Sequence, residues 1–158
     1  MYKTKNDLPE KIRADAVAIL NARLADSIDL MHQAKQAHWN VKGPTFIALH
    51  KLFDELAETV EGLSDEIAER ATALGGIARG TLRQGASASR LPEFPHATFK
   101  DMAVVEVLAV RYADLAKTTR EAIDKADELA DKDTADLFTE VSRALDKALW
   151  LLEAHLQP

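Results

Sequence analysis

The chain has 158 residues, of which 47% are hydrophobic and 29% charged, and its formal net charge is −6. This length suits one domain with a real core, and the lack of cysteine excludes disulfides, thiolate metal sites and cysteine nucleophiles. No apolar run resembles a signal peptide or approaches the roughly 20 residues that span a bilayer, so we expect a single cytoplasmic domain over residues 1–158. The acidic balance disfavours general attraction to nucleic acid and suits cations better.

Two long helices are predicted in the first half of the chain, after a short tail of residues 1–8. Apolar residues at steps of three and four predict the first helix from about Pro9 to Trp39, and Gly43-Pro44 ends it. The second, from Thr45 to Leu74, is stopped by Gly75-Gly76. Its apolar seam is the most regular in the chain and predicts packing on other helices: Phe46, Leu49, Phe53, Leu56, Val60, Leu63 and Ile67.

A long connection over residues 76 to 97 is rich in Gly, Ser, Ala and Pro, with room for a short helix over Thr81 to Ala88. A connection of this length usually crosses a bundle or carries function. A third helix is predicted from Thr98 to Leu129, and an acidic turn leads to the last helix, Thr134 to Leu156. Four long helices with one long crossover between the second and third describe an all-α, ferritin-like four-helix bundle.

The second helix also carries a polar stripe. At about 100° per residue, His50, Asp54, Asp65 and Glu69 fall at roughly 0°, 40°, 60° and 100°, whereas the apolar seam falls at roughly 220° to 320°. One imidazole and three carboxylates are donors that suit Fe(II), Mn(II) or Zn(II). Taken singly, each of these residues is more often a structural histidine or a solvated acid than a metal ligand.

The stripe is too long for one metal site in one chain, because His50 and Asp65 are separated by roughly 22 Å of helix. Either two unrelated sites exist or a second chain completes one. The spacing favours the second alternative: a two-fold axis near residues 59 and 60 would place Glu69 and Asp65 of an antiparallel copy opposite His50 and Asp54. His38, just before the Gly43-Pro44 turn, can approach His50 within the same chain.

A ferritin-type site within one bundle uses a Glu-x-x-His pair on a helix. The only such spacing here runs from Glu93 to His96, and Pro95 places it in the loop. A metal site inside the bundle is therefore not predicted, which again favours a site shared between chains. His32 and His155 have no ligand partner at a useful spacing and are interpreted, with His96, as structural.

At these residues the chain resembles the family of DNA-binding proteins from starved cells (Dps), small ferritin relatives that form shells of twelve subunits. The resemblance covers nearly the whole chain, and its two histidines and two acidic positions keep the family's spacing together. The segments that carry it are residues 36–43, residues 46–50 with Asp54, residues 65–70 with 74–76, and residues 133–136, 142–143 and 145–147 near the C-terminus.

The resemblance implies that His38, His50 and Asp54 of one subunit and Asp65 and Glu69 of its two-fold partner hold Fe(II). In the family this iron is oxidised preferentially by hydrogen peroxide and mineralised as Fe(III) inside the hollow shell, which protects against oxidative stress. Trp39 follows a ligand and is expected to intercept radicals, although packing is the simpler explanation for it. Iron entry through acidic three-fold pores is implied as well, with Asp136 the first choice and Asp131 and Asp133 weaker ones.

The family's name also implies DNA binding, but here the sequence offers less. Members that bind DNA usually use an extended lysine-rich tail, whereas Lys3, Lys5 and Lys11 stand against Asp7 and Glu10. Twelve copies of this tail could still amplify weak contacts. We therefore expect DNA binding, and with it association with the nucleoid, to be weak. A nucleoid-associated protein that physically protects DNA is the alternative to an iron-oxidising store.

Overall fold

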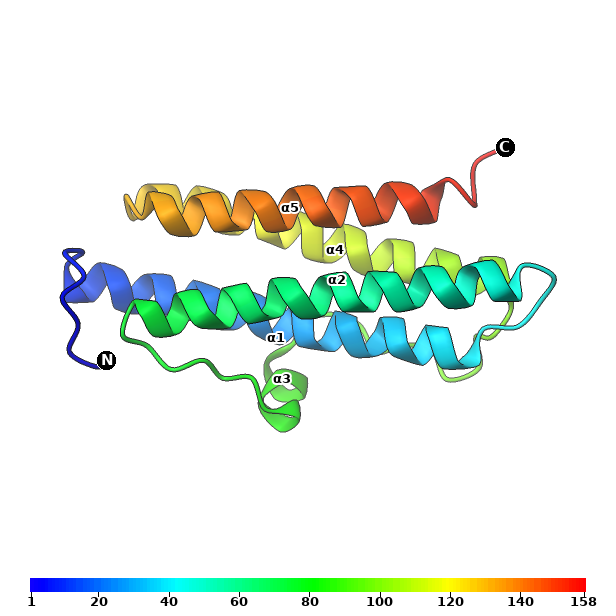
Figure 1. Cartoon of the computed structure of the whole chain (residues 1–158), viewed down its shortest axis with the longest axis horizontal. Helices are drawn as coiled ribbons and strands as arrows, with labels where there is room; N and C mark the ends of the chain where they lie inside the picture. Colours follow the sequence, from blue (N-terminus) through cyan, green and yellow to red (C-terminus); the bar gives the residue numbers. More distant parts are fainter.

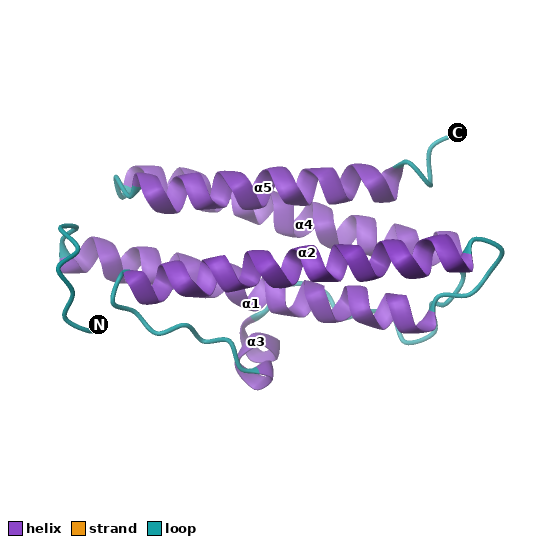
Figure 2. Cartoon of the chain, in the orientation of Figure 1, coloured by secondary structure: helices purple, strands orange, loops and turns teal.

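The computed structural model describes residues 1–158, which form helices and no strand (Figures 1 and 2). α1 and α2 form one antiparallel hairpin, α4 and α5 form a second, and the crossover between them carries the short α3. The predicted all-α four-helix bundle with a helix in its long crossover is confirmed. The helices are α1 (Glu10–Asn40), α2 (Phe46–Ala73), α3 (Leu82–Ala88), α4 (Asp101–Glu128) and α5 (Lys132–Glu153).

The predicted helix ends agree better in the first hairpin than in the second. α4 begins at Asp101 rather than Thr98. The residues before it pair instead with the turn of the first hairpin: the Lys42 amide donates to the Phe99 carbonyl (2.8 Å), and the Asp101 amide donates to the Lys42 carbonyl (3.0 Å). This backbone pairing fixes the α1–α2 turn against the start of α4.

The core lies between the two hairpins and contains most of the predicted seam of α2. Phe46 is the exception, because 42% of its surface is exposed. None of the helices combines the length and the apolar character that a membrane span requires. The largest fully buried side chains come from all four long helices and the end of α2: Tyr112, Phe53, Phe138, Leu20, Leu30, Leu49, Ile67, Leu74, Leu108, Leu115, Leu145 and Leu152.

The crossover is anchored on α1 by side chains rather than by apolar packing alone. The carboxylate of Asp26, 1% exposed, accepts hydrogen bonds from the Arg90 amide (2.8 Å) and the Arg90 guanidinium (3.0 Å). One turn along α1, Asp29 accepts a hydrogen bond from the Ser89 hydroxyl (2.5 Å). These bonds set the path of the chain after α3.

The N-terminal tail folds back on the bundle. The Tyr2 amide donates to the Gly75 carbonyl (2.6 Å), and Arg13 donates to the neighbouring Leu74 carbonyl (2.9 Å). Gly75 has a positive φ of 81°, which a residue without a side chain adopts at little cost. The tail is thus docked near the end of α2 and does not extend away from the molecule.

Candidate metal centre

Two histidines meet where α1 ends and α2 begins. His38 lies in the last turn of α1 and His50 in the second turn of α2. Their rings stack, with centroids 3.8 Å apart and an angle of 19° between the ring planes. The structure brings these two side chains together within one chain, as the hairpin geometry predicts.

The two rings are held by reciprocal hydrogen bonds. His38 Nδ1 lies 2.6 Å from the His50 carbonyl oxygen, and His50 Nδ1 lies 2.8 Å from the His38 carbonyl oxygen. A carbonyl oxygen can only accept, so both Nδ1 atoms carry the proton. In the neutral rings, each Nε2 therefore has a lone pair available, which is the arrangement found in metal-ligating histidines.

Asp54 lies beside the histidine pair, one turn along α2 from His50. Its Oδ1 is 3.8 Å from His38 Nδ1 and forms an ion pair with the Lys35 ammonium group. The hydrogen bond from Lys35 holds the pKa of the Asp54 carboxyl below its usual range, with weaker help from the histidines, and it raises the pKa of Lys35. The carboxyl is therefore ionised, and the Lys35 ammonium group is its partner in the single chain.

Lys35 is a site residue that the sequence analysis missed. It lies three residues before His38, so the two side chains share a face of α1. Because α1 and α2 are antiparallel, this face also meets Asp54. The three-residue spacing from His38 could have indicated that Lys35 lies at the site, but a lysine near carboxylates is more simply interpreted as part of a surface ion pair.

Asp65 and Glu69 are not near the histidines of their own chain. Both are exposed on the second half of α2, and neither side chain forms an ion pair or a hydrogen bond. Within the single chain, no three histidine or acidic side chains gather into a metal site. Of the five predicted ligands, the structure pairs His38 with His50 and places Asp54 3.8 Å from His38, short of a complete metal site, and it leaves Asp65 and Glu69 free.

Three apolar residues close to the histidines, in sequence or in space, remain accessible. Trp39 is 66% exposed and Ile47 is 59% exposed, so neither packs into the core. The Phe46 ring lies 5.2 Å from the His50 ring, centroid to centroid. Packing within the chain therefore does not explain Trp39. An apolar rim around a polar pair is typical of a surface that a partner covers.

Asp131 does not fit the predicted acidic pore, and this prediction is corrected here. It is buried, it accepts hydrogen bonds from the Thr134 amide and hydroxyl as the N-cap of α5, and it forms an ion pair with Arg70 (2.7 Å). This cap is also why α5 begins at Lys132, earlier than predicted. Asp133 and Asp136 are exposed on the first turns of α5 and remain pore predictions.

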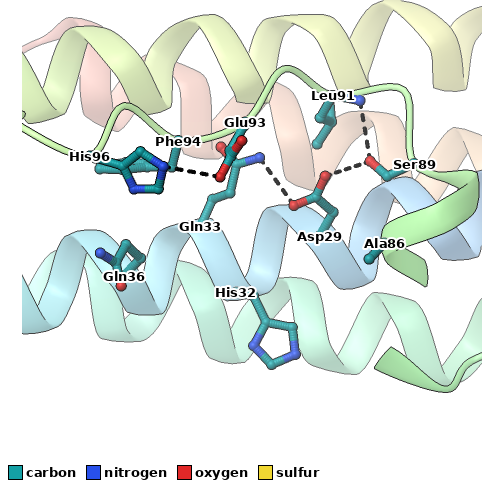
Figure 3. A pocket seen from close by; sticks show the side chains of 10 residues that line it. All are labelled: Asp29, His32, Gln33, Gln36, Ala86, Ser89, Leu91, Glu93, Phe94 and His96. Atoms are coloured by element: carbon teal, nitrogen blue, oxygen red, sulfur yellow. Dashed lines mark hydrogen bonds and ion pairs between the residues drawn. The ribbon is translucent and has the colours of Figure 1, made fainter. Parts of the chain in front are cut away.

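A cavity of about 530 Å³ between α1 and the crossover contains two of the remaining histidines (Figure 3). His96 Nε2 lies 3.4 Å from Glu93 Oε1, and both side chains are exposed. His32 is directed away from this pair, toward the opposite side of α1. The Glu93–His96 spacing is thus a loop contact, which agrees with its exclusion as a bundle-type metal motif.

Comparison with known proteins places this architecture in a family. Residues 17–158 match the ferritin-like domain family. A "DNA protection during starvation protein" from Agrobacterium fabrum is 47% identical over 99% of this chain and 96% of its own length. One of the same name from Brevibacillus brevis is 35% identical, over 88% and 93%. The structure of Mycobacterium smegmatis Dps in its tetragonal form superposes with a TM-score of 0.94 at 30% identity, covering 100% of this chain and 95% of that one.

Proposed function

Since this chain belongs to the Dps family of ferritin-like proteins, we propose that it oxidises Fe(II) with hydrogen peroxide and stores the Fe(III) product inside a shell of its own copies. The observation that carries the proposal is the stacked His38–His50 pair. Its reciprocal bonds to backbone carbonyls leave both Nε2 atoms free, beside a carboxylate of lowered pKa. These are two nitrogen donors and one oxygen donor, a set that suits Fe(II).

The proposed site is completed by a second subunit. Asp65 and Glu69 are exposed and unpaired in their own chain, and their spacing matches that of His50 and Asp54 about a point between residues 59 and 60. A two-fold axis at this point would bring Asp65 and Glu69 of the partner subunit to the histidine pair, and it would create the site twice. The apolar rim of Trp39, Phe46 and Ile47 would be covered by the same contact.

The chemistry proposed for this site takes two electrons at a time. Two Fe(II) ions each give one electron to hydrogen peroxide, the O–O bond breaks, and two Fe(III) ions and two hydroxide ions form. Because both electrons arrive together, no hydroxyl radical is released. The residues of the chain hold the iron close together among carboxylates that favour the higher charge of Fe(III). Trp39 beside His38 is the proposed interceptor of stray radicals, and Asp133 and Asp136 are the proposed entry acids.

Lys35 is proposed to keep Asp54 occupied until iron arrives. Its ammonium group bonds the carboxylate that a metal ion would use, so iron must displace it. The charges of Glu58 and Glu61 also contribute to the raised pKa of Lys35, after the bond to Asp54. These two carboxylates lie on α2, as Asp54 does, and offer the displaced ammonium group other acceptors.

A mixture of two variants tests the shared site. One variant carries His38→Ala and His50→Ala, and the other carries Asp65→Asn and Glu69→Gln. Alone, each is expected to lose rapid oxidation of Fe(II) by peroxide. After unfolding and refolding together, half of the random pairs are mixed, and each mixed pair contains one intact site, so roughly a quarter of the wild-type activity returns. No recovery in a mixture whose assembly is verified would contradict the two-chain site.

DNA protection is the second candidate, because the name of the relatives specifies it. Two observations oppose it: the net charge is −6, and the tail is bonded to Gly75 at the end of α2. Gel shifts at low and moderate salt, with residues 1–8 present or deleted, test it. Retardation that disappears with the tail would support this function, and no shift at low salt would remove it.

A further inference from the structure

A pocket between α1 and α4 combines basic side chains with small apolar ones. Its volume is about 250 Å³, and no acidic residue lines it. Arg23 in this pocket is roughly 22 Å along α1 from His38, so the pocket is separate from the proposed iron site. We refer to it as the Arg23 pocket; its lining residues are Ala18, Ile19, Ala22, Arg23, Arg90, Ala122 and Lys125.

Arg23 is the most deeply placed of the three cations, with 5% of its surface exposed. Its Nη1 donates to the Thr118 carbonyl (3.0 Å) and its Nη2 to Asp26 (2.5 Å). Its Nε is buried and has no hydrogen-bond partner. A buried donor of a charged group left without an acceptor is costly and rare in folded proteins. Arg23 thus has one unmet hydrogen-bond donor in a side chain that lines this pocket.

The charges around the pocket are unbalanced. The Arg90 guanidinium bonds the same Asp26 oxygen as Arg23 (3.0 Å), so two guanidinium groups share one carboxylate. Lys125 forms no ion pair, and its ammonium group adds a third positive charge. Asp29, the next acid along α1, accepts hydrogen bonds from the neutral Gln33 and Ser89 and adds a second negative charge, so three cations face two carboxylates. An excess of positive charge therefore remains in a partly enclosed space.

We propose that the Arg23 pocket binds a phosphate group through Arg23, Arg90 and Lys125. Guanidinium groups bind phosphate oxygens with directed, charge-assisted hydrogen bonds, and an ammonium group adds a mobile donor. The alanines that line the rest of the pocket leave room for a tetrahedral anion. The three cations come from α1, the crossover and α4, so a phosphate group would be held by three segments of the chain.

Two sources could supply this group: free phosphate, or the phosphate of a nucleic acid backbone. Both present the same oxygens to the three cations. They differ in size, because a backbone phosphate brings a sugar on each side and must fit them beside α1 and α4. The experiment below therefore measures phosphate first and then asks whether a nucleic acid competes for the site.

Lys125→Gln is the informative variant, because Lys125 has no bond within the chain whose loss would disturb the fold. Lys117→Gln is its matched control: Lys117 is exposed on the same helix, two turns earlier, and does not line the pocket. Isothermal titration of the assembled protein with sodium phosphate, at constant ionic strength, measures the affinity. We expect saturable binding that weakens about tenfold in Lys125→Gln, since a hydrogen bond to a charged group is lost, and that is unchanged in Lys117→Gln.

A second titration, in the presence of a short DNA duplex, separates the two sources. Weaker phosphate binding with duplex present identifies the backbone as a ligand of the pocket, and unchanged binding identifies free phosphate. Either result supports the site. The absence of saturable phosphate binding, or equal weakening in Lys125→Gln and Lys117→Gln, would overturn the proposal. Neither result bears on Fe(II) oxidation, so the two proposals are tested independently.

Discussion

The two halves of α2 carry the same kinds of polar groups in different states. In the first half, His50 is stacked on His38 and bonded to its carbonyl, and Asp54 is held by Lys35. In the second half, Asp65 and Glu69 are exposed, and their carboxylates have no partner within the chain. The polar side chains of the first half are positioned by contacts with α1, whereas those of the second half have no partner in the chain.

This contrast indicates how the two subunits would divide the proposed site. The histidine half is positioned by α1, so its geometry exists before any second chain arrives. In the single chain, Asp65 and Glu69 incur no desolvation free energy, because exposed carboxylates remain hydrated. A two-fold contact would then combine a rigid half-site with a mobile one. Substitutions in each half can therefore be tested separately.

His50→Ala should have the largest effect. It removes a proposed ligand and also the bond to the His38 carbonyl, one of the unsatisfied carbonyls at the end of α1. We expect oxidation of Fe(II) by peroxide to slow by about 100-fold or more, followed by the absorbance of Fe(III) in stopped flow. His32→Ala is the control, since His32 is exposed and directed elsewhere. Equal rates for wild type and His50→Ala would refute the assigned site.

Asp65→Asn combined with Glu69→Gln tests the acidic half. Both changes keep the size of the side chain, and neither breaks a bond in the single chain. We expect oxidation to slow by about 10- to 100-fold, while the free energy of unfolding of the chain changes by less than about 0.5 kcal/mol. Glu66→Gln, on another face of the same helix, is the control. Normal oxidation in the double variant would leave the second half of α2 without a role in the chemistry.

The sequence predicts the fold well because the apolar seam of α2 is regular from Leu49 to Ile67, and because glycines lie just before and just after this helix. It predicts less well where distant segments meet. The late start of α4 depends on the pairing of Lys42 with Phe99 and Asp101, residues far apart in the sequence. No pattern in the sequence around either segment predicts this backbone pairing.

The site shows the same division. The approach of His38 to His50 follows from a short hairpin, so spacing alone predicts it. Asp131 failed as a pore residue because its burial depends on Arg70, which arrives from another helix. Lys35 was missed for a related reason: its partner Asp54 is on the neighbouring helix, and lysines on exposed helix faces are common. Spacing predicts the histidine pair, whereas the ion pairs of Lys35 and Asp131 depend on side chains of other helices.

Lys35→Met should increase the affinity of the histidine half of the site for Fe(II). Without the ammonium group, Asp54 is free to bind iron, although a partly exposed ion pair is weak, so the Fe(II) concentration for half-saturation should fall by only about two- to fivefold. Anaerobic titration with Fe(II) measures this change. Lys51→Met, an exposed lysine on α2, is the matched control. Weaker iron binding in Lys35→Met would mean that Lys35 positions Asp54 instead of competing for it.

Gly43→Ala acts on the turn that brings the two histidines together, and we expect the smallest effect on oxidation. Gly43 has φ 139°, and a Cβ there would lie 2.5 Å from Asp101 Oδ2, whose carboxyl holds Thr45 at the start of α2 (2.8 Å). The strain should lower the free energy of unfolding by about 1–3 kcal/mol, measured by chemical denaturation.

Gly62→Ala is the comparison of opposite sign, because Gly62 is helical and no atom within 4 Å would meet its Cβ. This change should stabilise the single chain by about 0.5–1 kcal/mol. Gly62 also lies close to the proposed two-fold axis on α2, where a second copy would approach. If Gly62→Ala raises helix stability but weakens assembly on dilution, the lost affinity reports contact with another chain at the middle of α2. If it strengthens both, the two halves of α2 do not meet a partner about this axis.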